Sequence, residues 1–338
     1  LRAPALFPVA EILTDAPASS SYLTLSPCRI IEVPGENEQV VKVGVIDLPV
    51  FYLDFTGRAK NLPDYRSSTR DVRRLIDEMK AEGIQGLVVD LRNNGGGSLL
   101  EATTLTGLFI DEGPVVQVRN SSGRISTEED TDPGMAWDGP MAVLVNRYSA
   151  SASEIFAAAI QDYARGVIIG QETFGKGTVQ NLYALDQYMR GEDGESFGQL
   201  TLTIGKYYRV TGESTQHRGV NPDIELPSHI NAELIGESVR DSALPWDTIA
   251  TTRFRAGKPL DGAIQSLAVG YEKRAKDDPN YRYQVDMIRA AEAMSEQKTV
   301  SLNIDKRREE REVIVGPRHH RSRCARCCAT PAASWSHP

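Results

Sequence analysis

The segment IQGLVVDLRNNGGGSLLEATTLTGLFI, residues 84–110, decides the fold class. Its first eight residues form a nearly continuous apolar run, which is typical of a strand buried on both faces of a sheet. Three glycines then indicate a tight turn, and the residues from Ser98 onward predict a helix. A buried strand that leads through a turn into a helix is the repeating unit of α/β folds with a parallel sheet.

The same order of elements occurs on both sides of this segment. Residues 67–83 carry apolar side chains at helical spacing, and residues 151–166 predict another helix. Apolar, β-branched and aromatic runs predict further strands at 40–48, 51–55, 141–146, 166–170, 178–185 and 199–210. The last two strands have no helix between them. We therefore expect an α/β core with a largely parallel sheet and an added β segment.

The composition limits the class of protein. The chain has 338 residues, of which 40% are apolar and 25% charged, as in an ordinary globular protein of about two domains. The net charge of −8 argues against a nucleic-acid binder that works through bulk charge. Its apolar runs are far shorter than the roughly 20 residues of a membrane helix. No signal-peptide pattern occurs near residue 1, so we expect none.

Changes of pattern along the chain predict four parts. We expect an irregular N-terminal remnant at 1–39, the α/β core at 40–230, a helical C-terminal region at 231–305 and a charged tail at 306–338. The tail holds three of the four cysteines and three of the five histidines. Their spacing is not that of paired zinc ligands, so we expect a disordered or non-native tail rather than a metal site.

Two loops join buried strands to helices, where ligands bind in open α/β sheets. In Asn93–Gly97, glycines let backbone N–H groups point at a bound group, although a tight turn alone also needs glycine. In Tyr148–Glu154, small residues can expose a serine hydroxyl as a nucleophile turn does, although serine also caps helices. The spacing does not choose among the three serines of this loop.

A serine nucleophile requires a base, and the chain offers few histidines for that role. Outside the tail there are His217 and His229, both in segments rich in Pro, Gly and Ser, which disfavours a Ser/His/Asp triad. Lys176, which lies between two glycines after an apolar strand, is the alternative base. Residues 170–178 also nearly match a phosphate-binding P-loop. A strand pattern follows it, however, and Gly177 replaces the metal-binding hydroxyl, so nucleotide binding is disfavoured.

Three motifs in one order resemble the C-terminal processing proteases, and among them the bacterial tail-specific proteases. These motifs are LVVDLRNNGGG (87–97), NRYSASASEIFAAAIQDYARG (146–166) and IGQETFGKGTVQ (169–180). The resemblance runs from about Val43 to about Leu302. It implies a crotonase-like (ClpP/crotonase) catalytic core, and a serine endopeptidase with a Ser/Lys dyad that needs neither metal nor cofactor.

Matched motif to motif, the resemblance assigns five residues. It implies Ser151 as the nucleophile, Lys176 as the general base and Gln180 as the residue that orients the lysine. The backbone N–H groups of Gly97 and Ala152 are implied to form the oxyanion hole. On an extended segment, residues four apart face the same side, so the role of Gln180 is geometrically reasonable. Gln180 is equally well interpreted as a polar residue on a half-exposed strand.

Asp162 is a candidate third member of a catalytic triad. It lies eleven residues after Ser151 on the predicted helix, on the same face but roughly 16 Å further along the axis. This separation disfavours a direct catalytic role. We expect Asp162 to pair with Arg165 or to anchor the end of the helix.

Family members usually carry a PDZ domain, which captures C-terminal carboxylates, before the catalytic core. The residues before Val40 are too few for one, and the N-terminal helical region of the tail-specific branch is not found, so we expect an incomplete reading frame. Two functions stay open. One is a protease for unfolded proteins or proteins recognised through their C-terminal tails, and the other is a catalytically incompetent remnant. The resemblance implies a periplasmic or envelope location and a lipoprotein adaptor for the full-length family; no nucleic acid and no membrane span are expected.

Overall fold

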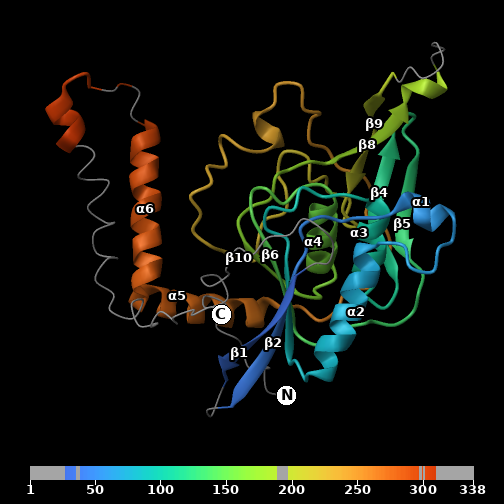
Figure 1. The fold of residues 1–338 in the computed structure, drawn as a ribbon, viewed down its shortest axis with the longest axis horizontal. Coiled ribbons are helices and arrows are strands. Elements are labelled where there is room, and N and C mark those ends of the chain that lie inside the picture. The colour runs from blue at the N-terminus through green and yellow to red at the C-terminus, as the bar shows by residue number, and fades with distance from the viewer. Residues whose placement is uncertain (1–26, 36–38, 189–196, 297–298, 300, 310–338) are drawn as a thin grey trace, which may run out of the picture. The chain divides into compact units, whose positions relative to one another are not determined.

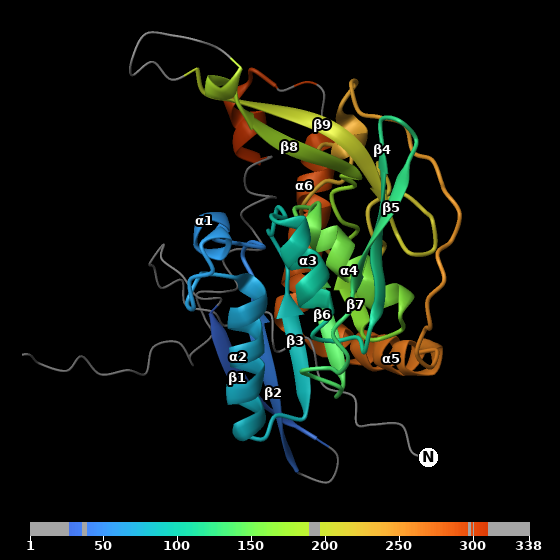
Figure 2. The ribbon, with the colours of Figure 1, turned by 90° about the vertical axis from the view of Figure 1, so that its right-hand side faces the viewer.

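The computed structural model describes residues 27–35, 39–188, 197–296, 299 and 301–309. Among them, the residues of 1–226 and 230–271 form one compact unit, and those of 227–229 and 272–338 form a second. Figures 1 and 2 show the elements of both units. The candidate residues all lie in the first unit. The histidines and cysteines of the predicted tail lie outside the described residues.

A six-stranded sheet forms the centre of the first unit, as the alternating pattern predicts. β1 pairs with β2 antiparallel and every other pair is parallel. In spatial order the strands are β1 (Cys28–Pro34), β2 (Val40–Asp47), β3 (Gly86–Asp90), β6 (Met141–Val145), β7 (Val167–Gly170) and β10 (Ile224–Glu225). All five residues of β3 are buried, which confirms that the segment chosen from the sequence forms a strand covered on both faces.

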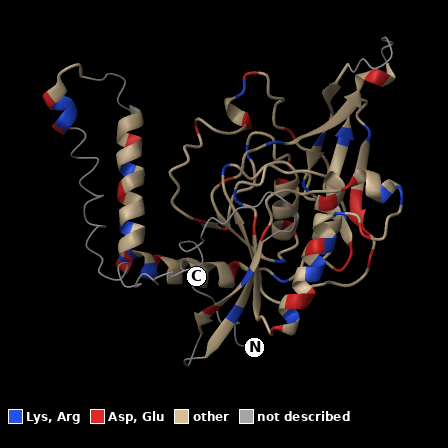
Figure 3. Cartoon of the chain, viewed as in Figure 1, with Lys and Arg blue, Asp and Glu red and all other residues tan. Residues whose placement is uncertain are grey.

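Helices cover both faces of this sheet. Apolar residues of α2 (Ser68–Ala81), α3 (Leu99–Thr106) and α4 (Ala152–Asp162) pack in one cluster with alternate residues of the central strands. The other alternate residues pack against Ile264 and Leu267 of α5 (Asp261–Asp277). Residues of both signs of charge lie along α2 (Figure 3). The mixed α/β architecture is therefore as expected.

The added β segment is a separate antiparallel sheet. Its spatial order is β5 (Ile125–Asp130), β4 (Gly113–Asn120), β9 (Gln199–Tyr208) and β8 (Thr178–Ala184). The sequence predicted β8 and β9 but not the first two strands. β8 begins two residues after Lys176, so this sheet places the lysine loop beside the main sheet.

The structure differs from the sequence prediction near the N-terminus. Residues 1–39 were expected to be irregular, but β1 pairs with β2 from Cys28↔Ile46 to Pro34↔Val40. The predicted strand 51–55 is wrong. Phe51 makes only a single bridge, to Gly97, and the last residue of the segment, Phe55, begins the short helix α1 (Phe55–Ala59). β1 satisfies the backbone groups along the edge of β2, which sequence patterns within β2 do not show.

The structure also differs after residue 230. The sequence predicted helix from Asn231, but residues 231–260 contain only one 3-10 turn, η4 (Glu237–Val239). Some backbone groups of this segment form turns within it, and others bond to loops of the core, as the Glu237 N–H group does to Phe174 O (3.0 Å). Regular helices begin with α5 and continue with α6 (Pro279–Glu296) in the second unit. Among the described residues, no helix is long and apolar enough to cross a membrane.

Candidate active site at the start of helix α4

Ser151 occupies the turn between β6 and α4. Its backbone has φ 58° and ψ −113°, a conformation that is strained for a residue with a side chain and that is held only by its surroundings. The neighbouring serines are buried and bonded, since the Ser149 hydroxyl donates to Leu91 O (2.8 Å) and that of Ser153 to Asn94 O (2.9 Å). Of the three serines that the sequence left open, Ser151 is the half-buried one.

The glycine loop lies directly against this turn. A Cβ atom on Gly96 would lie 2.8 Å from the Ser151 Cβ and 3.1 Å from the Ala152 nitrogen, so only glycine fits. The residues flanking Gly97 bond to Phe51, which directs the Gly97 N–H group to the opposite side. Within the described part of the chain, neither the Gly97 nor the Ala152 N–H group donates to a protein acceptor. Both are free to bind an oxyanion.

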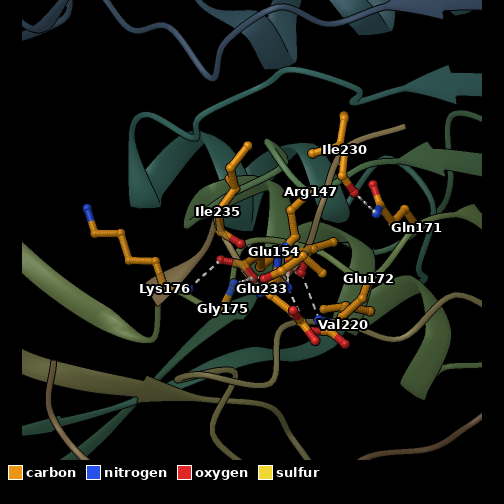
Figure 4. A network of polar contacts seen from close by, with 12 residues as sticks. Arg147, Glu154, Gln171, Glu172, Gly175, Lys176, Val220, Ile230, Glu233 and Ile235 are labelled. Carbon is orange, nitrogen blue, oxygen red and sulfur yellow. Dashed lines mark hydrogen bonds and ion pairs between the residues drawn. The ribbon is translucent and has the colours of Figure 1, made fainter. Parts of the chain in front are cut away.

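Lys176 lies on the loop between β7 and β8. Its Nζ donates to Gln180 Oε1 at 3.2 Å, so these two predicted residues are in contact. Between Lys176 Nζ and Ser151 Oγ, both of them described, the structure has no hydrogen bond. The lysine side chain extends away from the buried polar cluster around Glu154 (Figure 4). The structure therefore brings the lysine to Gln180 and not to the serine.

A buried carboxyl joins the serine turn to the lysine loop. Glu154 Oε2 accepts from the backbone N–H groups of Ser151 (2.8 Å) and Lys176 (3.0 Å). Its Oε1 accepts from the Thr173 hydroxyl (2.6 Å) and the Gly175 N–H group (2.7 Å). Burial raises the pKa of Glu154 from its ordinary value of 4.5 to about 7, although the four donors act to lower it.

Tyr207 holds the same two backbones from the other side. It comes from β9, and its hydroxyl donates to the carbonyl oxygens of Lys176 and, at 3.3 Å, Ser151. Burial raises the pKa of Tyr207 well above its ordinary value, with the nearby Glu154 as the second cause, so the hydroxyl keeps its proton. Glu154 and Tyr207 together fix the backbones of both candidate catalytic residues.

A cleft of about 490 Å³ lies beside this arrangement. It is lined by glycine-loop and nucleophile-turn residues, by Lys176 and Gln180, and by residues 237–244. This volume is within the range of ligand sites in proteins.

Two residues considered from the sequence have other roles, and the P-loop interpretation of Lys176 is not supported. His217 Nε2 bonds to Leu244 O at 2.7 Å, which does not favour it as the base. Asp162 pairs with Arg209 (Arg209 Nε to Asp162 Oδ2, 3.1 Å), and not with Arg165 as one expectation had it. Asp162 nevertheless anchors the end of α4. Lys176 leads into strand β8 rather than a helix, which is not the geometry of a P-loop.

The sequence reasoning did not identify Glu154 or Tyr207. The spacing Ser151-x-x-Glu154 is that of a helix capping box, which predicts the bond to the Ser151 N–H group. It does not predict the second bond, to Lys176, because that residue is 22 positions further along the chain. Tyr207 carries no local signal, since its contacts depend on the pairing of β8 with β9.

The chain matches known proteins over most of its length. Residues 42–226 match the model of Peptidase family S41, and residues 230–318 match that of the C-terminal domain of tail specific protease. The chain is 41% identical over 282 residues to the tail-specific protease of Haemophilus influenzae, which covers 82% of this chain and 38% of the relative. It is 34% identical over 168 residues to the carboxy-terminal processing protease CtpA of Bacillus subtilis, which covers 48% and 34%.

Among solved structures, the photosystem II D1 C-terminal processing protease is similar at 28% identity, with a TM-score of 0.47 over 64% of this chain and 52% of that one. The chain spans less than two fifths of the length of the two relatives above. The matches confirm the resemblance found in the motifs, while the crotonase-like details stay a prediction. Since the S41 model covers more than half of the sequence, the chain belongs to peptidase family S41.

Proposed function

We propose that this chain is the catalytic part of a serine endopeptidase in which Ser151 is the nucleophile and Lys176 the general base. The observation that carries the proposal is the shared support of these two residues. Glu154 accepts from both of their backbone N–H groups, and Tyr207 donates to both of their carbonyls. One buried acid and one buried hydroxyl each bond to the backbones of both residues, which supports the proposal that the two act as a pair.

The mechanism requires a movement of the lysine side chain. The Nζ atom leaves Gln180 and, as the neutral amine, takes the proton from the Ser151 hydroxyl. The serine oxygen attacks the peptide carbonyl, and the N–H groups of Gly97 and Ala152 stabilise the oxyanion. The lysine gives its proton to the departing amine, which leaves an ester on Ser151. Water, deprotonated by the same lysine, then hydrolyses the ester and restores the hydroxyl.

The relatives indicate which proteins would be cleaved. They are named for tail-specific and carboxy-terminal processing, and we extend this to substrates recognised through their C-terminal tails. For the full-length protein we propose the cell envelope or periplasm as the location, and a lipoprotein adaptor as a partner. Gln180 is proposed to orient Lys176, which the 3.2 Å contact supports.

The test is degradation of a reporter protein with an unstable fold and an apolar C-terminus. We expect cleavage by the parent, and a loss on the order of 10³-fold or more in Ser151→Ala and in Lys176→Ala. A Lys273→Ala variant, at an exposed position of α5, serves as the control and is expected to keep the parent rate. A folded parent that does not cleave would favour the second candidate, the incompetent remnant. The observation that favours this candidate is the missing hydrogen bond between the described side chains of Ser151 and Lys176.

A further inference from the structure

The second half of segment 231–244 lines one side of the cleft that holds Lys176 and Gln180. Glu237, Arg240 and Leu244 of this segment line the cleft together with Lys176. The segment has no helix apart from the single turn η4, and only turn bonds such as Leu234 N–H to Asn231 O form within it, so contacts with the core contribute to its path. It belongs to the match with the tail-specific C-terminal domain, yet it lies in the same compact unit as the protease core. We call residues 231–244 the cleft wall.

A buried guanidinium holds the cleft wall in place. The Arg147 side chain is 2% exposed, and it lies four positions before Ser151 on the same turn. Its Nε donates to Ile235 O at 2.6 Å and its Nη2 to Ala232 O at 3.3 Å. Its Nη1 donates to the Glu172 carboxylate at 2.5 Å and to a carbonyl of the lysine loop. One side chain therefore joins the nucleophile turn, the lysine loop and the wall (Figure 4).

Further contacts show that the fit is close. A Cβ atom on Gly236 would lie 2.3 Å from Arg147 Nη2, so the wall backbone packs directly on the guanidinium. The Glu237 N–H group donates to Phe174 O at 3.0 Å. A buried charge is costly unless it is paired, so the Arg147 guanidinium needs acceptors for its donors. Here the guanidinium donates to carbonyl groups that accept no hydrogen bond within a helix.

We infer that Arg147 is a positioning residue that fixes residues 231–244 as a wall of the peptide-binding cleft. The first part of the C-terminal domain then contributes to substrate affinity, whereas Ser151 and Lys176 perform the chemical step. The inference rests on the proposed protease function and adds a substrate-binding role for a segment that follows the S41 match. It separates two measurable quantities, KM and kcat.

The first experiment compares two arginines with a short fluorogenic peptide. In Arg147→Lys the planar fork is lost, and we expect KM to rise about tenfold with kcat within about threefold of the parent. Arg165→Lys is the matched control, because Arg165 also donates to three carbonyls (Phe109, Trp137 and Gly139, 2.6–2.9 Å) but far from the cleft. The melting temperature of the control is expected to fall, while its KM stays that of the parent. An unchanged KM in Arg147→Lys, or an equal rise in both variants, overturns the inference.

A second pair of variants covers the case in which Arg147→Lys does not fold. Arg240 is 62% exposed on the wall, and its Nε is 3.9 Å from Glu237. Arg289 on α6 is 74% exposed and lies 3.8 Å from an acid three positions earlier, so it is a close match outside the cleft. We expect Arg240→Ala to change KM at least threefold with an unchanged melting temperature, and Arg289→Ala to match the parent. Equal KM values in the two variants contradict a binding role for the wall.

Binding in an inactive background separates this inference from the protease function. A labelled extended peptide is titrated against Ser151→Ala alone and against Ser151→Ala combined with Arg147→Lys or with Arg240→Ala. Weaker binding in the combined variants supports the wall even if the parent cleaves nothing. Equal affinity in all three rejects the wall even if the parent is an active protease.

Discussion

The two ends of helix α4 each hold a buried acid, and the two acids are stabilised in different ways. Glu154 in the first turn accepts four hydrogen bonds from uncharged donors. Asp162 in the last turn forms an ion pair with Arg209, and their side chains are 5% and 15% exposed. Burial raises the pKa of both acids. One helix thus presents a carboxyl held by uncharged donors at the candidate site and an ion pair at its far end.

The two acids therefore have different roles: one fixes the geometry of the candidate site, and the other contributes to the stability of the fold. Three of the four donors of Glu154 are backbone N–H groups of the serine turn and the lysine loop, so we expect any change of this acid to move the candidate catalytic residues. The partner of Asp162 comes from the segment after β9, so this acid fastens the added sheet to the helix. We expect changes at the first end to affect turnover and changes at the second end to affect unfolding.

The largest expected effect comes from Glu154→Gln. Each carboxylate oxygen accepts two donors, so the amide nitrogen of glutamine faces two donors that it cannot accept. We expect activity to fall on the order of 10²-fold, because small displacements of reacting groups are costly. Glu101→Gln is the matched control: Glu101 is also buried and accepts from Ser67, Ser68 and Thr69, away from the site. Equal activity in the two variants contradicts the comparison.

Asp162→Asn tests the other end of α4. Asparagine carries no charge, so the largely buried guanidinium of Arg209 loses its ion-pair partner. We therefore expect a loss of about 3–5 kcal/mol in the free energy of unfolding. The kcat of the folded fraction is expected to stay near the parent value. Urea unfolding followed by far-UV CD measures the loss. Glu78→Gln breaks an exposed pair with Arg74 and is expected to cost below about 1 kcal/mol; a similar value for both variants argues against the buried pair.

The pH dependence of stability gives a third test. The pKa of Glu154 is raised to about 7 in the folded state, whereas the unfolded value is near 4.5, so the folded state binds the extra proton between these pH values. Stability therefore falls as pH rises from about 4.5 to about 7, by on the order of 3 kcal/mol, and this contribution is flat above that range. Subtracting the urea-unfolding profile of Glu154→Gln from that of the parent isolates it. A difference that rises with pH through this window rejects the assignment.

The smallest expected effect comes from Tyr207→Phe. The change removes the hydroxyl that donates to the carbonyls of Ser151 and Lys176, and we expect a loss of about 1 kcal/mol in stability. We also expect about a tenfold loss of activity, which a fluorogenic peptide assay measures. Tyr208→Phe is the control, because this neighbour donates to Asp247 instead (3.1 Å). If the two variants lose equal activity, Tyr207 does not act through the site.

Local patterns predicted most of the main sheet and its helices. Helix 67–83 is present as α2, and its buried residues Val72, Leu75, Ile76 and Met79 follow the helical period. The strands of the second sheet that follow the lysine were also predicted, while β4 and β5 were not. Segment 231–260 was expected to be helical. Arg147 instead donates to the carbonyls of Ala232 and Ile235 in this segment, and no pattern within 231–260 indicates where that arginine lies.

The sequence by itself determined the family, the α/β class and the candidate residues, because strand and helix periods and the three motifs are properties of consecutive residues. Only the tertiary structure decided which groups support those candidates. It shows that Ser149 and Ser153 are engaged in buried bonds, and that one carboxyl joins the turn of Ser151 to the loop of Lys176. Such contacts join residues that are distant in the chain, and burial rather than local propensity fixes both their strength and their pKa values.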